Sequence, residues 1–243
     1  MNFNLANQKY WDSIYESYEP EILKKDHPIR QWLEIYFKKG NLDCFEIGCY
    51  PGQILSIFGE LGYTLNGIDQ TPFVKSKLPV WLISKGFRIG NIMKGNFLKY
   101  KTNEKFDVVC SFGFIEHFTN WEEVLMKQTM LVKKNGYLIV ETPNFSGYLQ
   151  RILHSVFDKE NYLRHNISSM NPLKWKKLLE EKEFDILYYG CFGYFEFWTE
   201  IKRKNIFIKL ILKILNLFLL ILKKLPKDKK LYSPYCGLIA LKR

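Results

Sequence analysis

The chain has 243 residues, 47% of them hydrophobic and 25% charged, a balance that suits one globular domain with a sizeable core. Its first residues lack the basic and apolar regions of a signal peptide, and its five cysteines are scattered without CxxC spacing. We therefore expect a reduced cytoplasmic protein, which fits these cysteines better than a disulfide scaffold or a zinc site. The net charge is +11, but residues 201–230 hold ten basic side chains and one acid. Because most of the excess charge lies there, no nucleic-acid-binding surface is expected on the rest of the chain.

Apolar runs alternate with amphipathic segments along the chain. Two helices are expected at the start, over residues 7–18 and 29–39. Further helices are expected over 53–61, 71–85 with a break near Pro79, 121–134, and from 171 with Asn171 as the N-cap. Short buried strands are expected over residues 42–47, 64–68, 106–111, 137–141, 184–189 and 235–241. This alternation predicts a largely parallel sheet with right-handed crossovers.

A glycine-containing turn follows the first expected strand. Residues 45–52 are FEIGCYPG, in which Gly48 and Gly52 allow the backbone to approach a ligand closely at the carboxyl end of the strand. Asp69 ends the second strand about 20 residues further on, where a carboxylate suits the two hydroxyls of a ribose. A plain structural turn and a helix N-cap are the alternative interpretations of these two features.

The order and spacing of these segments resemble class I S-adenosylmethionine-dependent methyltransferases of the small-molecule branch. Residues 46–52 are similar to the family's motif I, residues 94–97 (KGNF) occupy the place of its adenine-contacting loop, and residues 111–118 (SFGFIEHF) resemble the motif after its fourth strand. Two positions depart from the family pattern. Tyr50-Pro51 stands where a third glycine is usual, and Asn96 stands where an acid is usual, although its amide carbonyl still accepts from an adenine amino group.

The resemblance implies a Rossmann-like α/β fold with a seven-stranded, mostly parallel sheet, an antiparallel last strand and helices on both faces. It also implies S-adenosylmethionine as the cofactor. The residues that the resemblance assigns to cofactor binding are Tyr10, Glu46, Gly48, Cys49, Tyr50, Gly52, Asp69, Gln70, Asn96, Phe97, Ser111 and Phe112.

The reaction implied is a metal-free SN2 transfer of the methyl group, to which alignment contributes most. A hydroxyl acceptor must also lose a proton, and His117 and His165 are the candidate bases because imidazole titrates near neutrality. The alternative for the Glu116-His117 pair is a cap or a support for the cofactor loop. The acceptor expected first is a sugar or a sugar- or phosphate-linked intermediate of surface-glycan biosynthesis, and the second is a lipid-linked or quinone-type molecule. A nicotinamide-dependent oxidoreductase, against which the Gly-x3-Gly spacing argues, and a non-catalytic adaptor are the alternatives outside this class.

We expect a single domain over residues 1–243. Its parts are N-terminal cap helices (1–40), a cofactor-binding core (41–142), an acceptor-side half (143–200), a basic helical insertion (201–230) and a last strand (231–243). Within the insertion, residues 205–225 form an apolar helix with a narrow polar stripe. Peripheral contact with anionic lipid is expected rather than a membrane span, because the last strand must rejoin the sheet. A helix packed on the domain or in a homodimer interface is the alternative.

Overall fold

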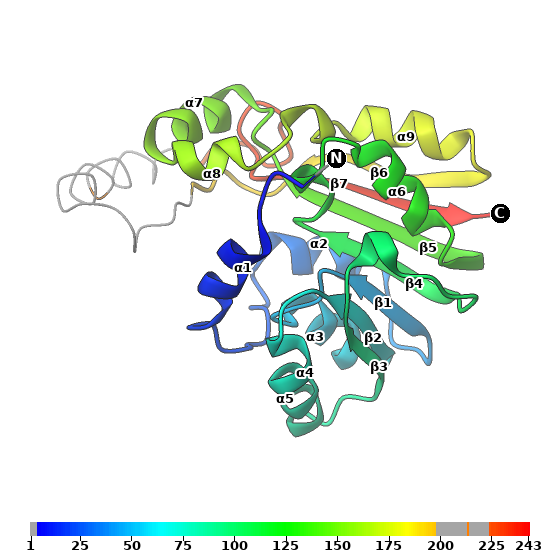
Figure 1. Ribbon diagram of the computed structural model, residues 1–243. Helices are drawn as coiled ribbons and strands as arrows, with labels where there is room; N and C mark the ends of the chain where they lie inside the picture. The colour runs from blue at the N-terminus through cyan, green and yellow to red at the C-terminus, as the bar shows by residue number, and fades with distance from the viewer. Residues whose placement is uncertain (1–3, 198–212, 214–223) are drawn as a thin grey trace.

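The structure is a computed structural model that describes residues 4–197, 213 and 224–243. Within those residues, seven strands form one sheet in the order β3-β2-β1-β4-β5-β7-β6 (Figure 1). β7 runs antiparallel to both of its neighbours, whereas the pairings among β1 to β5 are parallel. The expected mostly parallel sheet with an antiparallel last strand is confirmed. The strands are β1 (Asp43–Ile47), β2 (Thr64–Asp69), β3 (Ile89–Lys94), β4 (Phe106–Phe112), β5 (Val132–Pro143), β6 (Phe184–Phe192) and β7 (Tyr235–Lys242).

Helices cover both faces of the sheet. One face packs against α2, α3 and α5, and the other against α6 and α9. Helices α1, α7 and α8 gather at one end of the sheet, on the left in Figure 1. The helices are α1 (Gln8–Tyr15), α2 (Pro28–Tyr36), α3 (Gln53–Glu60), α4 (Phe73–Ser76), α5 (Leu78–Ser84), α6 (Trp121–Thr129), α7 (Tyr148–Phe157), α8 (Lys159–Leu163) and α9 (Pro172–Glu180).

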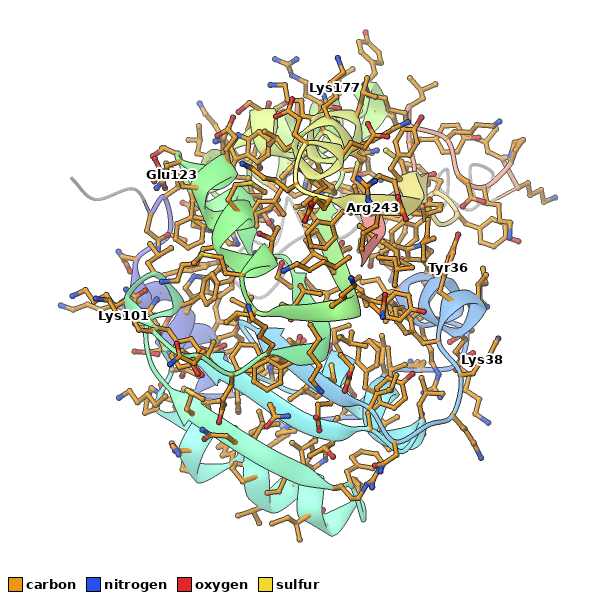
Figure 2. The ribbon with its side chains drawn as sticks, turned by 90° about the vertical axis from the view of Figure 1, so that its right-hand side faces the viewer. Tyr36, Lys38, Lys101, Glu123, Lys177 and Arg243 are labelled. Atoms are coloured by element: carbon orange, nitrogen blue, oxygen red, sulfur yellow. The ribbon has the colours of Figure 1, made fainter. Side chains whose placement is uncertain are left out.

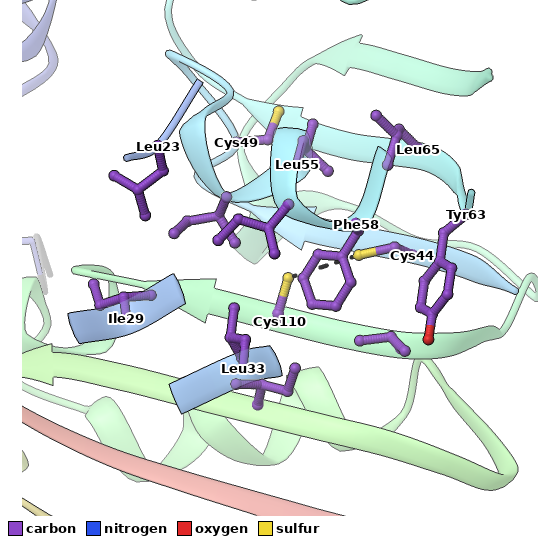
Figure 3. Close-up of a cluster of buried hydrophobic side chains, with 14 of the residues drawn as sticks. Leu23, Ile29, Leu33, Cys44, Cys49, Leu55, Phe58, Tyr63, Leu65 and Cys110 are labelled. Carbon is purple, nitrogen blue, oxygen red and sulfur yellow. Dashed lines mark hydrogen bonds between the residues drawn. The ribbon is translucent and has the colours of Figure 1, made fainter. Parts of the chain in front are cut away.

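The central strands are apolar on both faces because helices cover both. In β1, Cys44 contributes to the cluster of buried side chains under α2 and α3, whereas Phe45 and Ile47 contribute to the cluster under α6 and α9. This two-residue alternation is the pleat of a doubly covered strand. Figure 3 shows the first cluster, in which the Cys44 and Cys110 sulfur atoms lie 3.9 Å apart across neighbouring strands. At the other end of the sheet, charged side chains such as Lys38, Lys101 and Glu123 point into solvent (Figure 2).

The expected helix over residues 121–134 is too long. α6 ends at Thr129, and β5 already begins at Val132, which is paired with Phe106 of β4. Leu131 and Val132 are buried, so burial in the sheet overrides the helical pattern of this segment. Asn135 has a φ of 60° and belongs to a register shift within β5 rather than to a helix end.

Other local expectations are met or extended. The helix expected over residues 71–85 is broken into α4 and α5 at Lys77, two residues before Pro79. Asn171 caps α9 by accepting a hydrogen bond from the Leu173 amide. The sequence pattern does not indicate β3, because this edge strand carries few buried apolar side chains.

The basic helix expected over residues 205–225 lies outside the described residues, apart from residues 213, 224 and 225. Its expected membrane contact and its role in a homodimer therefore stay predictions. In the described part of the chain, no helix is long and apolar enough to cross a membrane.

The packing of α2 on the sheet generates a stability prediction. Leu33 is 0% exposed, and Ile35 on the same helix is 67% exposed. Replacing Leu33 by alanine leaves a cavity and is expected to lower the free energy of unfolding by about 2–5 kcal/mol. Replacing Ile35 by alanine is the matched control and is expected to change it by no more than about 0.5 kcal/mol. Urea denaturation of both variants tests this, and equal effects would contradict the packing described.

Candidate functional site

A cavity of about 310 Å³ opens where β1, β2 and β4 end at their carboxyl edge. Ligands of open parallel sheets bind at this edge, and the volume lies in the range of small-molecule sites. Its walls come from strand ends, α1 and the segments after β3 and β4. The lining residues best suited to contact a ligand are Trp11, Tyr15, Glu46, Gly48, Tyr50, Asp69, Gln70, Asn96, Phe97, Phe112, Phe114, His117 and Glu141.

The turn after β1 forms the floor of the cavity. Gly48 has a φ of +76° and Gly52 a φ of +93°, both in the region that disfavours side chains. A Cβ at Gly52 would lie 2.4 Å from the Leu78 side chain, so this position also needs the space that glycine leaves. The Tyr50–Pro51 peptide bond is cis, and the Tyr50 hydroxyl donates a hydrogen bond to the Tyr18 carbonyl. The turn thus reaches the cavity with its backbone although the third glycine is absent.

Asp69 stands at the end of β2 and faces the cavity. Its carboxylate accepts hydrogen bonds from the backbone amides of Tyr50 (3.1 Å) and Thr71 (2.9 Å), which fix its orientation. Burial raises the pKa of Asp69 to about 6, although these backbone hydrogen bonds oppose the shift. Each carboxylate oxygen has a second lone pair, so the group can still accept from the hydroxyls of a ribose.

Glu46 lies beside Asp69 in the same wall. It is buried, and its Oε2 atom has no hydrogen-bond partner among the described residues. Burial, followed by the charge of Asp69, raises the pKa of Glu46 well above its usual range. An unsatisfied buried carboxyl oxygen is costly unless a ligand supplies the donor. The amino group of S-adenosylmethionine is such a donor, so Glu46 and Asp69 together fit this cofactor.

The N-terminal helix α1 covers the cavity with aromatic side chains. Trp11 and Tyr15 line it, and the Tyr15 ring packs edge-on against Tyr50 with ring centroids 5.0 Å apart. Tyr10, expected to contact the cofactor, is not among the lining residues. Its ring instead stacks under the Arg164 guanidinium, which donates a 2.6 Å hydrogen bond to its hydroxyl. The helical period places Tyr10 on a different side of α1 from Tyr15.

The other expected cofactor residues fall into two groups. Cys49, Gln70, Asn96, Phe97 and Phe112 line the cavity together with the motif I glycines. Ser111 does not: it is fully buried, and its hydroxyl donates to the Gln128 side chain at 3.0 Å. The alternation of β4 explains the difference, since neighbouring residues point to opposite sides of a strand.

Sequence reasoning missed Glu141, at the end of β5. It is buried, lines the cavity and accepts a hydrogen bond from the Gly113 amide at 3.2 Å. Burial raises the pKa of Glu141 to about 8. An acid that ends a buried strand next to β4 was the available signal, because the carboxyl ends of adjacent parallel strands share one edge.

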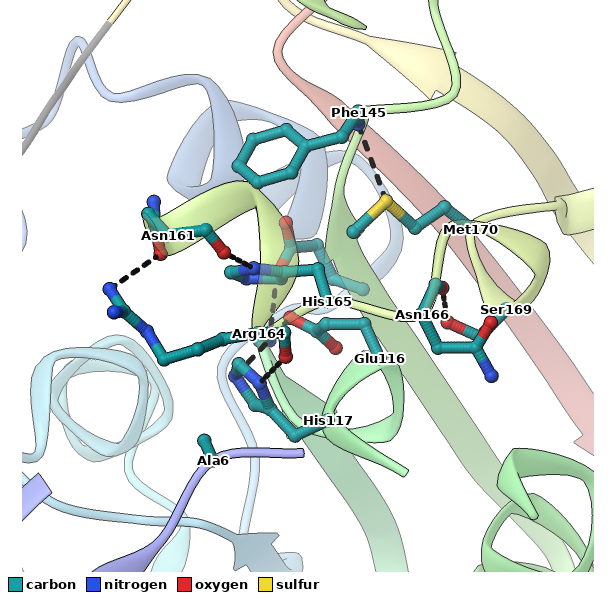
Figure 4. Close-up of polar contacts among 12 residues, drawn as sticks. Ala6, Glu116, His117, Phe145, Asn161, Arg164, His165, Asn166, Ser169 and Met170 are labelled. Carbon is teal, nitrogen blue, oxygen red and sulfur yellow. Dashed lines mark hydrogen bonds and ion pairs between the residues drawn. The ribbon is translucent and has the colours of Figure 1, made fainter. Parts of the chain in front are cut away.

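His117 and His165 lie close together, with ring centroids 4.7 Å apart (Figure 4). His117 belongs to the one-turn 3₁₀ helix Ile115–His117 and lines the cavity. His165 follows α8 and is not among the residues that line the cavity. The Nδ1 atom of His117 is 3.1 Å from the Arg164 carbonyl oxygen, and that of His165 is 2.6 Å from the Asn161 carbonyl oxygen. Burial lowers the pKa of His117 to about 4 and that of His165 to about 3, so both rings are neutral at neutral pH.

The strand order and the cavity at the carboxyl edge define the fold of class I methyltransferases. The chain matches the family described as "Methyltransferase domain" over residues 21–189, and it belongs to that family. S-adenosylmethionine is the cofactor expected for it.

Relatives and solved structures of similar fold agree with this assignment. The chain is 23% identical over 122 residues to the ubiquinone biosynthesis O-methyltransferase of Rickettsia canadensis, covering 50% of this chain and 51% of the relative. It thus spans about half the length of the curated relatives it matches. A SAM-dependent methyltransferase from Archaeoglobus fulgidus superposes with a TM-score of 0.56 at 21% identity, covering 88% of this chain and 93% of that one. Magnesium protoporphyrin IX methyltransferase from Synechocystis PCC 6803 with bound SAH gives 0.56 at 12% identity, covering 88% and 80%.

The raised pKa of Asp69 predicts how cofactor binding depends on pH. Below a pKa of about 6 the carboxyl group takes up a proton and loses its charge and one acceptor site. The affinity for S-adenosylhomocysteine, the demethylated cofactor, is therefore expected to fall about tenfold between pH 7 and pH 5. Calorimetry across this range measures it, with Asp69→Asn as a variant that binds more weakly and without this pH dependence. The same slope in Asp69→Asn would assign the titration to another group, such as Glu46.

Proposed function

We propose that this protein transfers the methyl group of S-adenosylmethionine to a hydroxyl oxygen of a small aromatic acceptor. The observation that carries the proposal is the lining of the cavity, which combines polar acceptor groups with several aromatic side chains. Glu46, Asp69 and Asn96 offer acceptors that suit the amino, ribose and adenine groups of the cofactor. The side near α1 and the 3₁₀ turn after β4 is lined by Trp11, Tyr15, Phe114 and Phe118.

Aromatic side chains favour a flat, phenol-like acceptor. Rings pack on one another in stacked or edge-on arrangements that add to the burial of their surface. The similarity to ubiquinone biosynthesis O-methyltransferases also supports a quinol-type or phenolic acceptor. A sugar or sugar- or phosphate-linked acceptor is the second candidate, because Asn4, Gln8 and Glu141 supply polar atoms to the same cavity.

The transfer forms a bond between the acceptor oxygen and the methyl carbon and breaks the bond from that carbon to sulfur. The sulfonium becomes a neutral thioether, and the hydroxyl proton is lost. His117 is the lining side chain best suited to assist this loss. Its Nδ1 atom faces a carbonyl oxygen and must carry the ring proton, so its Nε2 atom keeps a lone pair.

His117→Ala tests the proposed role of this side chain. Turnover is expected to fall about 10²–10⁴-fold, because a positioned group that assists proton loss contributes that much. The affinity for S-adenosylhomocysteine is expected to stay near the wild-type value, since the cofactor contacts lie on the other side of the cavity. His27→Asn is the matched control, because His27 lies outside the cavity and an asparagine keeps its capping contact with the Ile29 amide.

The acceptor class is measured by the formation of S-adenosylhomocysteine from a panel of catechols, simple phenols and monosaccharides. Catechols and phenols are expected to react and monosaccharides to be inert. Turnover confined to monosaccharides would replace the phenolic acceptor by the sugar, and absence of S-adenosylhomocysteine binding would refute the proposed methyl transfer itself.

A further inference from the structure

Glu116, His117 and His165 form a compact group of metal-ligand atoms. One nitrogen from each histidine and one oxygen from Glu116 all lie within 4.8 Å of one another. Figure 4 shows the Glu116 carboxyl group between the two imidazole rings. The three side chains come from two segments, the 3₁₀ turn after β4 and the residues that follow α8.

The hydrogen bonds of the histidines leave their Nε2 atoms available. Both Nδ1 atoms face backbone carbonyl oxygens, Arg164 for His117 and Asn161 for His165. A carbonyl oxygen has no proton to give, so each Nδ1 atom must be the donor and each Nε2 atom carries a lone pair. Histidines that ligate metals are held in this way, with the second ring nitrogen donating to a carbonyl or carboxylate.

Glu116 has no hydrogen-bond partner for either carboxyl oxygen among the described residues, although it is 0% exposed. The nearest basic atom is the Nε2 of His117, 4.0 Å from Oε1. A carboxyl group buried without a donor is costly, and such groups in native proteins need an explanation. A cation between Glu116 and the two lone pairs supplies one.

The backbone holds the two segments together. The Asn166 amide donates to the Glu116 carbonyl at 2.7 Å, and the Asn166 side chain donates to the Phe118 carbonyl at 3.0 Å. The three ligand side chains are therefore positioned by contacts that do not depend on an ion. Ligands bonded to one ion at about 2.0–2.2 Å lie roughly 3.4 Å apart in a tetrahedral site. The ligand atoms, which lie within 4.8 Å of one another, need to approach by no more than about 1.4 Å to reach this geometry.

We propose that Glu116, His117 and His165 bind one divalent transition-metal ion of the Zn²⁺, Co²⁺ or Mn²⁺ class. Two imidazoles and one carboxylate suit these ions, whereas Mg²⁺ and Ca²⁺ prefer oxygen ligands alone. This departs from the metal-free transfer that the sequence resemblance implies. Three protein ligands leave a coordination position for a further oxygen. Because His117 lines the cavity, the ion lies at the edge of the cavity. If the proposed function holds, His117 acts as a ligand rather than as a base once the ion is bound, because its Nε2 lone pair is then shared with the ion. The charge of the ion then assists proton loss by lowering the pKa of the acceptor hydroxyl.

Co²⁺ titration of the full chain, stripped of metal with a chelator, tests the site. One Co²⁺ per chain is expected to bind and to give visible absorption bands of a nitrogen- and oxygen-ligated ion, and Zn²⁺ is expected to displace it. Glu116→Gln and His165→Gln are each expected to weaken metal binding about 100-fold or more, because each removes a ligand. Changes to residues that only support the ligands typically weaken binding about 10–100-fold, so the loss of a ligand is expected to cost more. His27→Asn is expected to bind like the wild type.

Three results would overturn the site. The first is a folded wild-type chain, checked by circular dichroism, that binds neither Co²⁺ nor Zn²⁺. The second is binding that survives in both ligand variants. The third is a sulfur-to-metal charge-transfer band, which would assign the ion to cysteines such as Cys191 and Cys236, whose sulfur atoms lie 2.9 Å apart. Binding of S-adenosylhomocysteine by the same metal-free sample tests the proposed function separately. A chain that binds the metal but not S-adenosylhomocysteine would support the metal site and refute the methyl transfer.

Discussion

Four carboxyl groups surround one end of the sheet, and the arrangement of the site depends on how their charge is balanced. Glu46, Glu116 and Glu141 are buried and Asp69 is half-buried. Among the described residues, no lysine or arginine forms an ion pair with any of the four. Burial raises the pKa of each group. Carboxyl groups whose pKa is raised in the folded state bind more protons there than in the unfolded chain, so their ionisation destabilises the fold as pH rises through that range.

Cationic ligands relieve this cost. S-adenosylmethionine carries a sulfonium and an ammonium group, and both are attracted to a cavity wall that contains Glu46 and Asp69. The demethylated product has lost the sulfonium charge, so the same wall holds it less strongly after transfer. The divalent ion proposed beside Glu116 would compensate the buried carboxyl group there in the same way. One electrostatic feature thus accounts for the cofactor preference and for the proposed metal site.

The cofactor half of the site was predictable from the sequence because it is built from strand ends that follow one another in the chain. Gly48 and Asp69 each come directly after an expected strand, and parallel pairing brings such positions to one edge. Asn96 was placed by the family resemblance instead, because the sequence pattern does not indicate β3 before it. Side chains alternate between the two sides of β4, so Phe112 faces the cavity and Ser111 does not. Which of the two faces the cavity cannot be decided from the sequence until the helices on each face of the sheet are known. The position of Tyr10 outside the cavity lining was unpredictable for a similar reason, since an amphipathic helix with several aromatic residues offers several faces.

The acceptor half was less predictable because its parts are distant in sequence. α1, the 3₁₀ turn after β4 and residues 161–166 meet through backbone contacts, such as the Leu5 amide on the His117 carbonyl and the Asn166 amide on the Glu116 carbonyl. No periodic pattern marks such contacts before the fold is known. The start of β5 gives a second example, because residues from Val132 onward pair with β4 although the local sequence predicts the end of a helix there.

The two halves also differ in how they tolerate change. The turn after β1 and the end of β2 are held by strand pairing, so cofactor binding there depends on the sheet itself. The acceptor side is held by side-chain and backbone contacts between loops, where Arg164 on Tyr10 and Asn166 on Phe118 connect separate segments. Substitutions in these loops are expected to reshape the proposed acceptor side of the cavity without disturbing the pairing of β1 and β2. In the proposed function, the fold therefore separates the chemistry of methyl donation from the choice of the molecule that receives the methyl group.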